Sequence, residues 1–274
     1  MADEIVVRPD VEHADLAALR DAYGKMQALS AGDNRGWILW ADRHGFPGYY
    51  CWHHAQEGPG PTQFTYDLFL PWHRAYLSYW ENVARDQHDG AIPPWWDWTS
   101  DLSHRQGIPA AYSQEEIDGE PNALFSGPMP DMPDNPARQT ERDPGPPRRL
   151  PSARRVEQVL ALTQYEDFSS QLQDIHDGVH GWVSGDMGVI PTSAFDPLFW
   201  AHHCMIDRIW YLWQLRHGVT NIPPRYLTMT LEPFGKTVQQ VLDVHELGYE
   251  YAVASVTVPG PAPGPAPAPA NGGA

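Results

Sequence analysis

The sequence has few cysteines, little positive charge and no long hydrophobic run, and each deficit excludes a class of protein. With 18 Lys and Arg against 35 Asp and Glu, the formal net charge of −17 argues against a nucleic-acid partner. No stretch approaches the roughly 18 consecutive apolar residues that suggest a membrane-spanning helix. The first residues, Met1 to Glu4, lack the basic and apolar regions of a secretory signal. We therefore expect a cytoplasmic protein, unless a signal-bearing partner exports it.

Only two cysteines occur, Cys51 and Cys204. A disulfide between them is possible by count, but a chain without a secretory signal more often keeps its thiols reduced. We therefore expect both thiols to be free of a disulfide.

The chain is rich instead in aromatic residues, proline and histidine. Its 274 residues include 12 Trp, 12 Tyr and 8 Phe, which are ample for a packed core. Residues 259–274 consist of Pro, Ala and Gly apart from Asn271, and such a composition cannot bury enough surface to become ordered. We expect one domain over residues 1–258 and a disordered tail over residues 259–274.

The hydrophobic spacing predicts a mainly α-helical fold. Apolar residues three or four positions apart indicate helices over residues 11–41, 65–86, 152–160, 167–182 and 197–216. We expect a long surface excursion over residues 107–151, a turn over 191–196, and one or two short strands within 237–258. The tryptophans of residues 95–98 are expected to pack in the core rather than bind a ligand. The sequence thus predicts a central helical bundle with long loops and a few short strands.

The histidines gather in two clusters. The first contains His44, His53, His54 and His73, and the second contains His176, His180, His202 and His203. Each cluster can supply three neutral imidazoles, which suit copper, zinc, iron or nickel. The clusters therefore predict two metal ions held side by side in one buried pocket.

Helix geometry selects among the histidines of the second cluster. His176 and His180 are four residues apart, so they lie about 40° apart around a helix and can bind one ion. His202 and His203 are adjacent and diverge by about 100°, so only one of them can face that ion. We favour His203, because Asp207 lies one turn further along the same face and could orient a neighbouring group. His202 is then expected to be packed or hydrogen-bonded.

The first cluster is less regular. His73 lies on a predicted helix whose inward residues are apolar, and a buried histidine there needs a partner such as a metal ion. His44 and His53 come from loop-like sequence. The competing histidines are His54, His88 and His104, of which the last two have polar neighbours and are expected to be solvated.

Long motifs around these histidines resemble those of the type 3 copper proteins, specifically the tyrosinase, catechol oxidase and polyphenol oxidase group. The motifs are residues 70–77 for the first copper, residues 176–180 and 196–207 for the second, the tryptophan-rich residues 94–98, and the tyrosine motif at residues 247–251. The likeness spans roughly residues 10–255.

This resemblance implies two copper ions as cofactors. It makes His44, His53 and His73 the ligands of the first copper, and His176, His180 and His203 those of the second. Cys51-Trp52-His53 resembles the unit in which some members join a cysteine thiol to a ligand imidazole through a thioether.

The chain departs from the family pattern before His73. The family usually places its second ligand nine residues earlier, where this chain has Phe64. Residues 55–63 therefore look like an insertion. We favour His53 over His54 as the displaced ligand because of Cys51.

Three further residues are expected to act on the substrate side of the second copper. Asp177 stands where the family often has an asparagine that helps a water to take the phenolic proton. Gln173 is the nearest match to the upstream glutamate that holds this water. Asp177 could itself act as the base, although a carboxylate near two copper ions is a weak one. Gly181 is expected to leave the mouth of the pocket unobstructed.

The resemblance implies O2-dependent oxidation of o-diphenols to o-quinones, together with hydroxylation of monophenols. Its alternatives are an o-aminophenol oxidase, a haemocyanin-like oxygen carrier and a structural zinc protein. Gly181 and the lack of an appended plug domain favour an enzyme. The expected partners are a phenolic small molecule, O2 and, where the chain does not load itself, a copper-delivery chaperone, with neither nucleic acid nor membrane among them.

Overall fold

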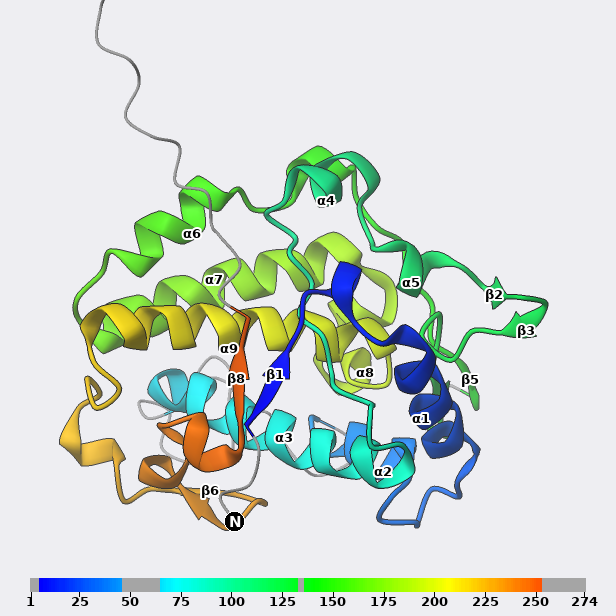
Figure 1. The fold of residues 1–274 in the computed structure, drawn as a ribbon, viewed down its shortest axis with the longest axis horizontal. Helices are drawn as coiled ribbons and strands as arrows, with labels where there is room; N and C mark the ends of the chain where they lie inside the picture. Colours follow the sequence, from blue (N-terminus) through cyan, green and yellow to red (C-terminus); the bar gives the residue numbers. More distant parts are fainter. Residues whose placement is uncertain (1–4, 46–64, 133–135, 253–274) are drawn as a thin grey trace, which may run out of the picture.

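The computed structural model describes residues 5–45, 65–132 and 136–252, and three long helices lie at its centre (Figure 1). They are α3 (Thr65–Gln87), α7 (Tyr165–Val183) and α9 (Pro197–His217). Helix α3 packs against both α7 and α9, and α1 (Leu16–Ala28) packs against α3. The expected helical bundle is therefore confirmed. The tail over residues 259–274 lies outside the described residues and stays a prediction.

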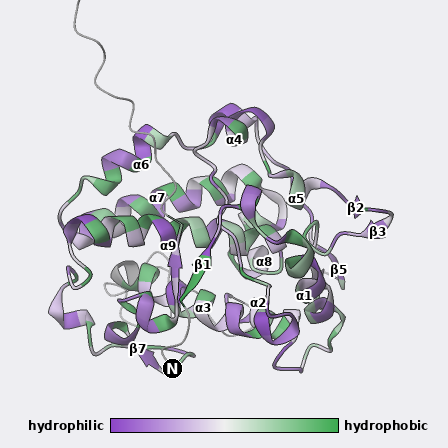
Figure 2. Ribbon diagram, in the orientation of Figure 1, coloured by the Kyte–Doolittle hydropathy of each residue, from purple (hydrophilic) through white to green (hydrophobic). Residues whose placement is uncertain are grey.

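Shorter elements surround the three helices. The remaining α-helices are α2 (Trp37–Asp42), α4 (Asp101–Gln106), α5 (Ala110–Ser113), α6 (Ala153–Leu160) and α8 (Ile190–Ser193). The antiparallel strand pairs are β2 (Glu116–Ile117) with β3 (Glu120–Pro121), β4 (Pro128–Met129) with β5 (Arg138–Gln139), and β6 (Thr230–Leu231) with β7 (Lys236–Thr237). Figure 2 shows α4, at the periphery, as largely hydrophilic. Among the described residues, none of the helices combines the length and hydrophobicity needed to span a bilayer.

The two ends of the described chain meet in a parallel strand pair. β1 (Val6–Arg8) lies beside β8 (Tyr249–Tyr251), as Figure 1 shows in blue and orange. The short strand expected within residues 237–258 is thereby confirmed. Because β1 and β8 are far apart in sequence, their pairing closes the fold around the helices.

The helical stretch expected over residues 11–41 is divided into α1 and α2, with the break near Gly32-Asp33-Asn34, where the sequence also indicates an interruption. The chain leaves α1 at Leu29, whose backbone is extended at φ −78° and ψ 151°. A turn follows, in which the amide of Asp33 donates to the carbonyl of Ser30, and α2 begins only at Trp37. The apolar spacing on the two sides of this turn is compatible with one helix, but the polar residues between them form the turn instead.

The excursion over residues 107–151 is not wholly on the surface. Leu124, Met129 and Leu150 are buried, so the segment contributes to the core as well as to the periphery. Arg142 binds both carboxylate oxygens of Asp196 at 2.7 and 2.6 Å. Since Asp196 also caps α9 by accepting from the amide of Leu198, this ion pair attaches the excursion to the start of α9. The turn expected over residues 191–196 is likewise partly the helix α8.

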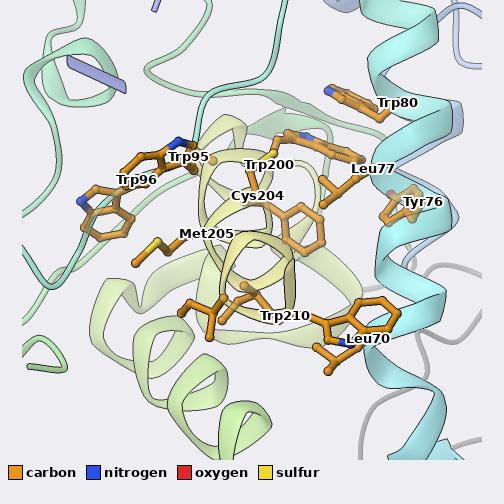
Figure 3. Packing of buried hydrophobic residues seen from close by; sticks show 14 of the residues in the cluster. Leu70, Tyr76, Leu77, Trp80, Trp95, Trp96, Trp200, Cys204, Met205 and Trp210 are labelled. Atoms are coloured by element: carbon orange, nitrogen blue, oxygen red, sulfur yellow. The ribbon is translucent and has the colours of Figure 1, made fainter. Parts of the chain in front are cut away.

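Aromatic side chains fill the space between the helices, as expected from the composition. Trp80 of α3 stacks on Trp200 of α9 with ring centroids 3.4 Å apart, and Figure 3 shows the two rings between these helices. The three tryptophans of residues 95–98 are at most 3% exposed, which confirms their place in the core. Helix α9 is buried along most of its length, because it lies at the centre of the bundle.

A buried carboxylate on α9 joins four elements. Asp207 accepts from Arg74 of α3 at 2.6 Å and from Tyr249 and Tyr251 of β8 at 2.6 and 2.7 Å. Arg8 of β1 lies 3.5 Å away. Burial raises the pKa of this carboxyl, but the charges of Arg74 and Arg8 outweigh burial and bring the pKa below its ordinary value. Asp207 is therefore ionised and links β1, α3, α9 and β8.

Replacing Asp207 by asparagine should strongly destabilise the protein, because the buried guanidinium of Arg74 loses its carboxylate partner and Arg8 keeps only Glu81. We expect Asp207→Asn to lower the free energy of unfolding by about 3–5 kcal/mol in urea titrations followed by tryptophan fluorescence. The matched control is Glu157→Gln, which breaks the exposed pair with Arg216 and should cost less than about 1 kcal/mol. Equal losses for the two variants would contradict the linking role of Asp207.

Candidate metal centre

Two groups of buried histidines meet at the centre of the helical bundle. One contains His44, His73 and His203, and the other contains His176, His180, His202 and His203. Within each group, one potential ligand atom per residue lies within 4.8 Å of the others. The predicted ligand His53, its competitor His54 and the thioether candidate Cys51 fall outside the described residues. The other five predicted ligands are brought together.

The first group is positioned by α2, α3 and α8. His44 follows the end of α2, and its Nδ1 lies 3.1 Å from the carbonyl oxygen of Ile190 in α8. This close approach requires the next residue to be small, because a Cβ on Gly45 would lie 3.1 Å from Cα of Pro191. His73 belongs to α3, and its Nδ1 lies 2.8 Å from the carbonyl oxygen of Phe69.

The second group comes from α7, α9 and the 3-10 helix η3 (Gly185–Gly188). His176 and His180 lie one turn apart on α7, as the spacing predicts. The Nδ1 of His180 lies 2.7 Å from the carbonyl oxygen of Met187 in η3, and the Nδ1 of His176 lies 2.8 Å from a carboxylate oxygen of Asp177. His203 of α9 faces both of them.

These contacts determine which nitrogen of four imidazoles carries the proton. Carbonyl and carboxylate oxygens only accept, so Nδ1 of His44, His73, His176 and His180 must donate. Each Nε2 then carries a lone pair and no proton.

The Nε2 atoms of the two groups face one another across short distances. The Nε2 atoms of His44 and His73 are 3.5 Å apart, and Nε2 of His203 is 3.2 Å from that of His176 and of His180. Converging lone pairs repel unless a proton or a cation lies between them. The donor set is thus that of a metal site, and neutral imidazoles fit copper ions well.

Burial keeps the imidazoles neutral. It lowers the pKa of His73 to about 3 and that of His180 to about 4. For His44 and His203, burial and then the neighbouring histidines lower the pKa well below its ordinary value. These histidines are therefore unprotonated and able to bind metal at neutral pH.

Two phenylalanines form apolar walls between the imidazoles. Phe69 lies 4.7 Å from the ring of His73 and 4.8 Å from that of His176. Phe199 lies 4.7 Å from the ring of His44 and 4.0 Å from that of His203. The ligand nitrogens consequently point into a space that is shielded from bulk water.

The three residues predicted to act on substrate take different places. Asp177 is bound to His176 on the side away from Nε2, so it orients a candidate ligand. Gln173 is fully buried one turn earlier, and its amide has no hydrogen-bond partner in the described part of the chain. Gly181 has open space around it among the described residues, since an added Cβ would meet nothing within 4 Å. Their chemical roles stay predictions.

Other predictions for this region have mixed outcomes. His88 is exposed and His104 binds the carbonyl of Pro151 at 3.1 Å, so neither joins a metal group. Cys204 is buried with a free thiol. Asp207 was expected to orient a neighbouring group, and this group is Arg74, which follows His73 in the sequence.

His202 is buried and packed, as expected. Neither ring nitrogen makes a hydrogen bond of normal geometry with the described residues. Its convergence with His176, His180 and His203 was missed, because helix rotation alone placed it on another face. The carbonyl acceptors of Met187 and Ile190 were also missed, since backbone groups give no signal in the sequence.

Comparison with known proteins yields a consistent set of relatives. The family model for the common central domain of tyrosinase matches residues 34–216. The chain is 30% identical over 221 residues to the tyrosinase of Streptomyces antibioticus, covering 68% of this chain and 79% of that protein. It is 28% identical to units G and H of the hemocyanin of Sepia officinalis, covering 80% of this chain and 40% of that protein. The chain therefore spans less than half the length of this hemocyanin relative.

A solved structure with the same fold is the tyrosinase of Burkholderia thailandensis at high pH. The TM-score is 0.77 at 22% identity, and the alignment covers 92% of this chain and 74% of that one. At this identity, the likeness shows the arrangement of the helices.

Removing one histidine from the first group, or both histidines of α7 from the second, should abolish one metal site and leave the other. We expect His73→Ala and the double variant His176→Ala/His180→Ala each to reduce bound copper from two ions to one per chain, measured by elemental analysis after dialysis. The control is His217→Ala, because His217 binds the carbonyl of Leu160 at 2.9 Å, away from both groups, and should leave two ions. Full copper content in His73→Ala or in the double variant would contradict the assignment.

Proposed function

Because this chain belongs to the tyrosinase family of type 3 copper proteins, we propose that it uses O2 to oxidise o-diphenols to o-quinones at two copper ions. Hydroxylation of monophenols is proposed as a second activity of the same site. The observation that carries the proposal is the convergence of Nε2 atoms from two buried groups of neutral histidines.

The proposed ligands are His44, His53 and His73 for the first copper and His176, His180 and His203 for the second. Copper, when bound, supplies the O2 binding and the electron transfer. The chain supplies the geometry. Four of the rings are fixed by hydrogen bonds from Nδ1, so they cannot turn their Nε2 atoms away from the metal.

An aromatic substrate suits the walls of the site. The rings of Phe69 and Phe199 border the histidines and exclude water, and apolar walls with a few polar groups are typical of small-molecule sites. Gly181 adds no side chain beside His180, so we propose that the phenol approaches the second copper on this side.

The proton chemistry favours diphenols over monophenols. Monophenol hydroxylation requires the loss of the phenolic proton, and Asp177 is the nearest carboxylate to the second group. Its hydrogen bond to His176 stabilises the anion, which makes it a weak base. The amide of Gln173 can hold a water but cannot accept its proton. We therefore propose faster turnover of diphenols than of monophenols.

An oxygen carrier is the second candidate function. The similarity to hemocyanin units covers 80% of this chain, and the histidine ligands do not distinguish a carrier from an oxidase. An o-aminophenol oxidase remains the near alternative within the enzymes, since an amine can take the place of one hydroxyl.

The test is a parallel assay of the copper-loaded chain with catechol, tyrosine and 2-aminophenol. We expect quinone formation from catechol to be fastest, with O2 consumed in step, and slower reaction with tyrosine. The copper-free protein is the control. Faster oxidation of 2-aminophenol than of catechol would establish the alternative enzyme, and reversible O2 uptake without quinone would establish a carrier.

The ligand contributed by residues 51–54 can be identified separately. We expect His53→Ala to lose one copper ion per chain and His54→Ala to keep both, because Cys51 marks His53 as the ligand. Mass analysis of the Cys51 peptide should show the loss of two hydrogens that accompanies a thioether. Copper loss in His54→Ala alone would overturn the choice of His53.

A further inference from the structure

The proposed ligand set leaves one central histidine without a role. His202 is completely buried on α9, and neither of its ring nitrogens makes a hydrogen bond of normal geometry in the described part of the chain, although the backbone of His176 lies near enough to interact with it. Buried polar atoms in native proteins are nearly always satisfied by protein, water or a bound ion. A phenylalanine would fill the same space without this deficit, so packing alone does not account for the imidazole.

The ring of His202 lies directly beside the second histidine group. It stacks on His176 with centroids 5.2 Å apart and an interplanar angle of 17°, and meets His180 edge-on at 4.8 Å. One nitrogen of His202 lies within 4.8 Å of the ligand atoms of His176, His180 and His203. Nitrogens bound to one ion at about 2.0–2.1 Å are roughly 3.3–4.2 Å apart, so His202 can reach the ion once its ring turns out of the stack with His176.

His203 belongs to both groups, so a fourth imidazole, that of His202, can serve as a ligand of the second site when His203 is needed at the first. The ring of His203 stacks on His73 of the first group at 4.5 Å, with an interplanar angle of 17°, while its Nε2 faces His176 and His180. An ion at the first site therefore competes for the position of His203. The second group contains a replacement ligand, and the first has none among the described residues.

We propose that His202 is a fourth ligand of the second site, which binds a single metal ion through His176, His180, His202 and His203 before the first site is filled. The second site is then the tighter one, and it loads first. This inference concerns metal binding alone and holds whether the loaded protein is an oxidase or an oxygen carrier.

The test uses one equivalent of Co²⁺ added to the metal-free chain, because its visible absorption depends on the number and type of ligands. His202→Phe keeps a ring that can stack on His176 but removes both nitrogens. We expect its affinity for the first equivalent to fall by about tenfold or more and its cobalt spectrum to change. The control His217→Phe should match the wild type in both respects.

A second measurement needs no variant and protects the test against misfolding of His202→Phe. Pulsed electron paramagnetic resonance of the wild type with one equivalent of Cu²⁺ counts the coupled imidazoles, and we expect four. A count of three imidazoles would overturn the proposal. So would an unchanged affinity and cobalt spectrum in folded His202→Phe. Either result would leave His202 as a residue that holds a buried water. Oxidation of catechol is not measured, so failure of the proposed function does not affect the result.

Discussion

The buried carboxylate of Asp207 is the interaction on which the arrangement of the bundle depends. It neutralises Arg74 on α3 and binds both tyrosines of β8, while Arg8 brings β1 to the same point. Arg74 directly follows His73, and Asp207 lies one turn after His203. The ion pair that joins α3 to α9 therefore also sets the separation of two candidate ligands, one from each group.

The opposite end of the site depends on backbone carbonyls that face the histidines. Asp186 in η3 binds Arg138 through both oxygens at 2.7 Å and accepts from the amide of Glu141. This fixes the segment whose carbonyls at Met187 and Ile190 receive the Nδ1 protons of His180 and His44. The excursion over residues 107–151, which looks like surface in the sequence, thus helps to hold the metal centre in position.

The sequence predicted the parts of the site that depend on periodicity and motif. His176 and His180 share a face of α7, and His73 lies inside α3, because helix rotation follows from spacing alone. The rotation angle per residue did not predict the position of the His202 ring. That position depends on the length of the side chain and on the packing of α7 beside α9. Between α1 and α2, the interruption at Gly32-Asp33-Asn34 is visible in the sequence, but the bounds of the two helices on either side of the turn at Ser30 to Asp33 are not. Tertiary packing determines both features, and the spacing of residues in the sequence carries no information about tertiary packing.

Oxidases and oxygen carriers in this family need the same metal ligands. They differ in whether a substrate larger than O2 must reach the metal ions. Both require neutral imidazoles in a dry pocket, which the burial of His44, His73 and His203 supplies. A phenol also requires an apolar approach, and exposed Val189 and Ile190 lie on the segment that carries the acceptors of His180 and His44. Gly181 follows His180, and an added Cβ there would meet nothing within 4 Å among the described residues. Access to the histidines, rather than their arrangement, is therefore the property in which an oxidase and a carrier of this family differ.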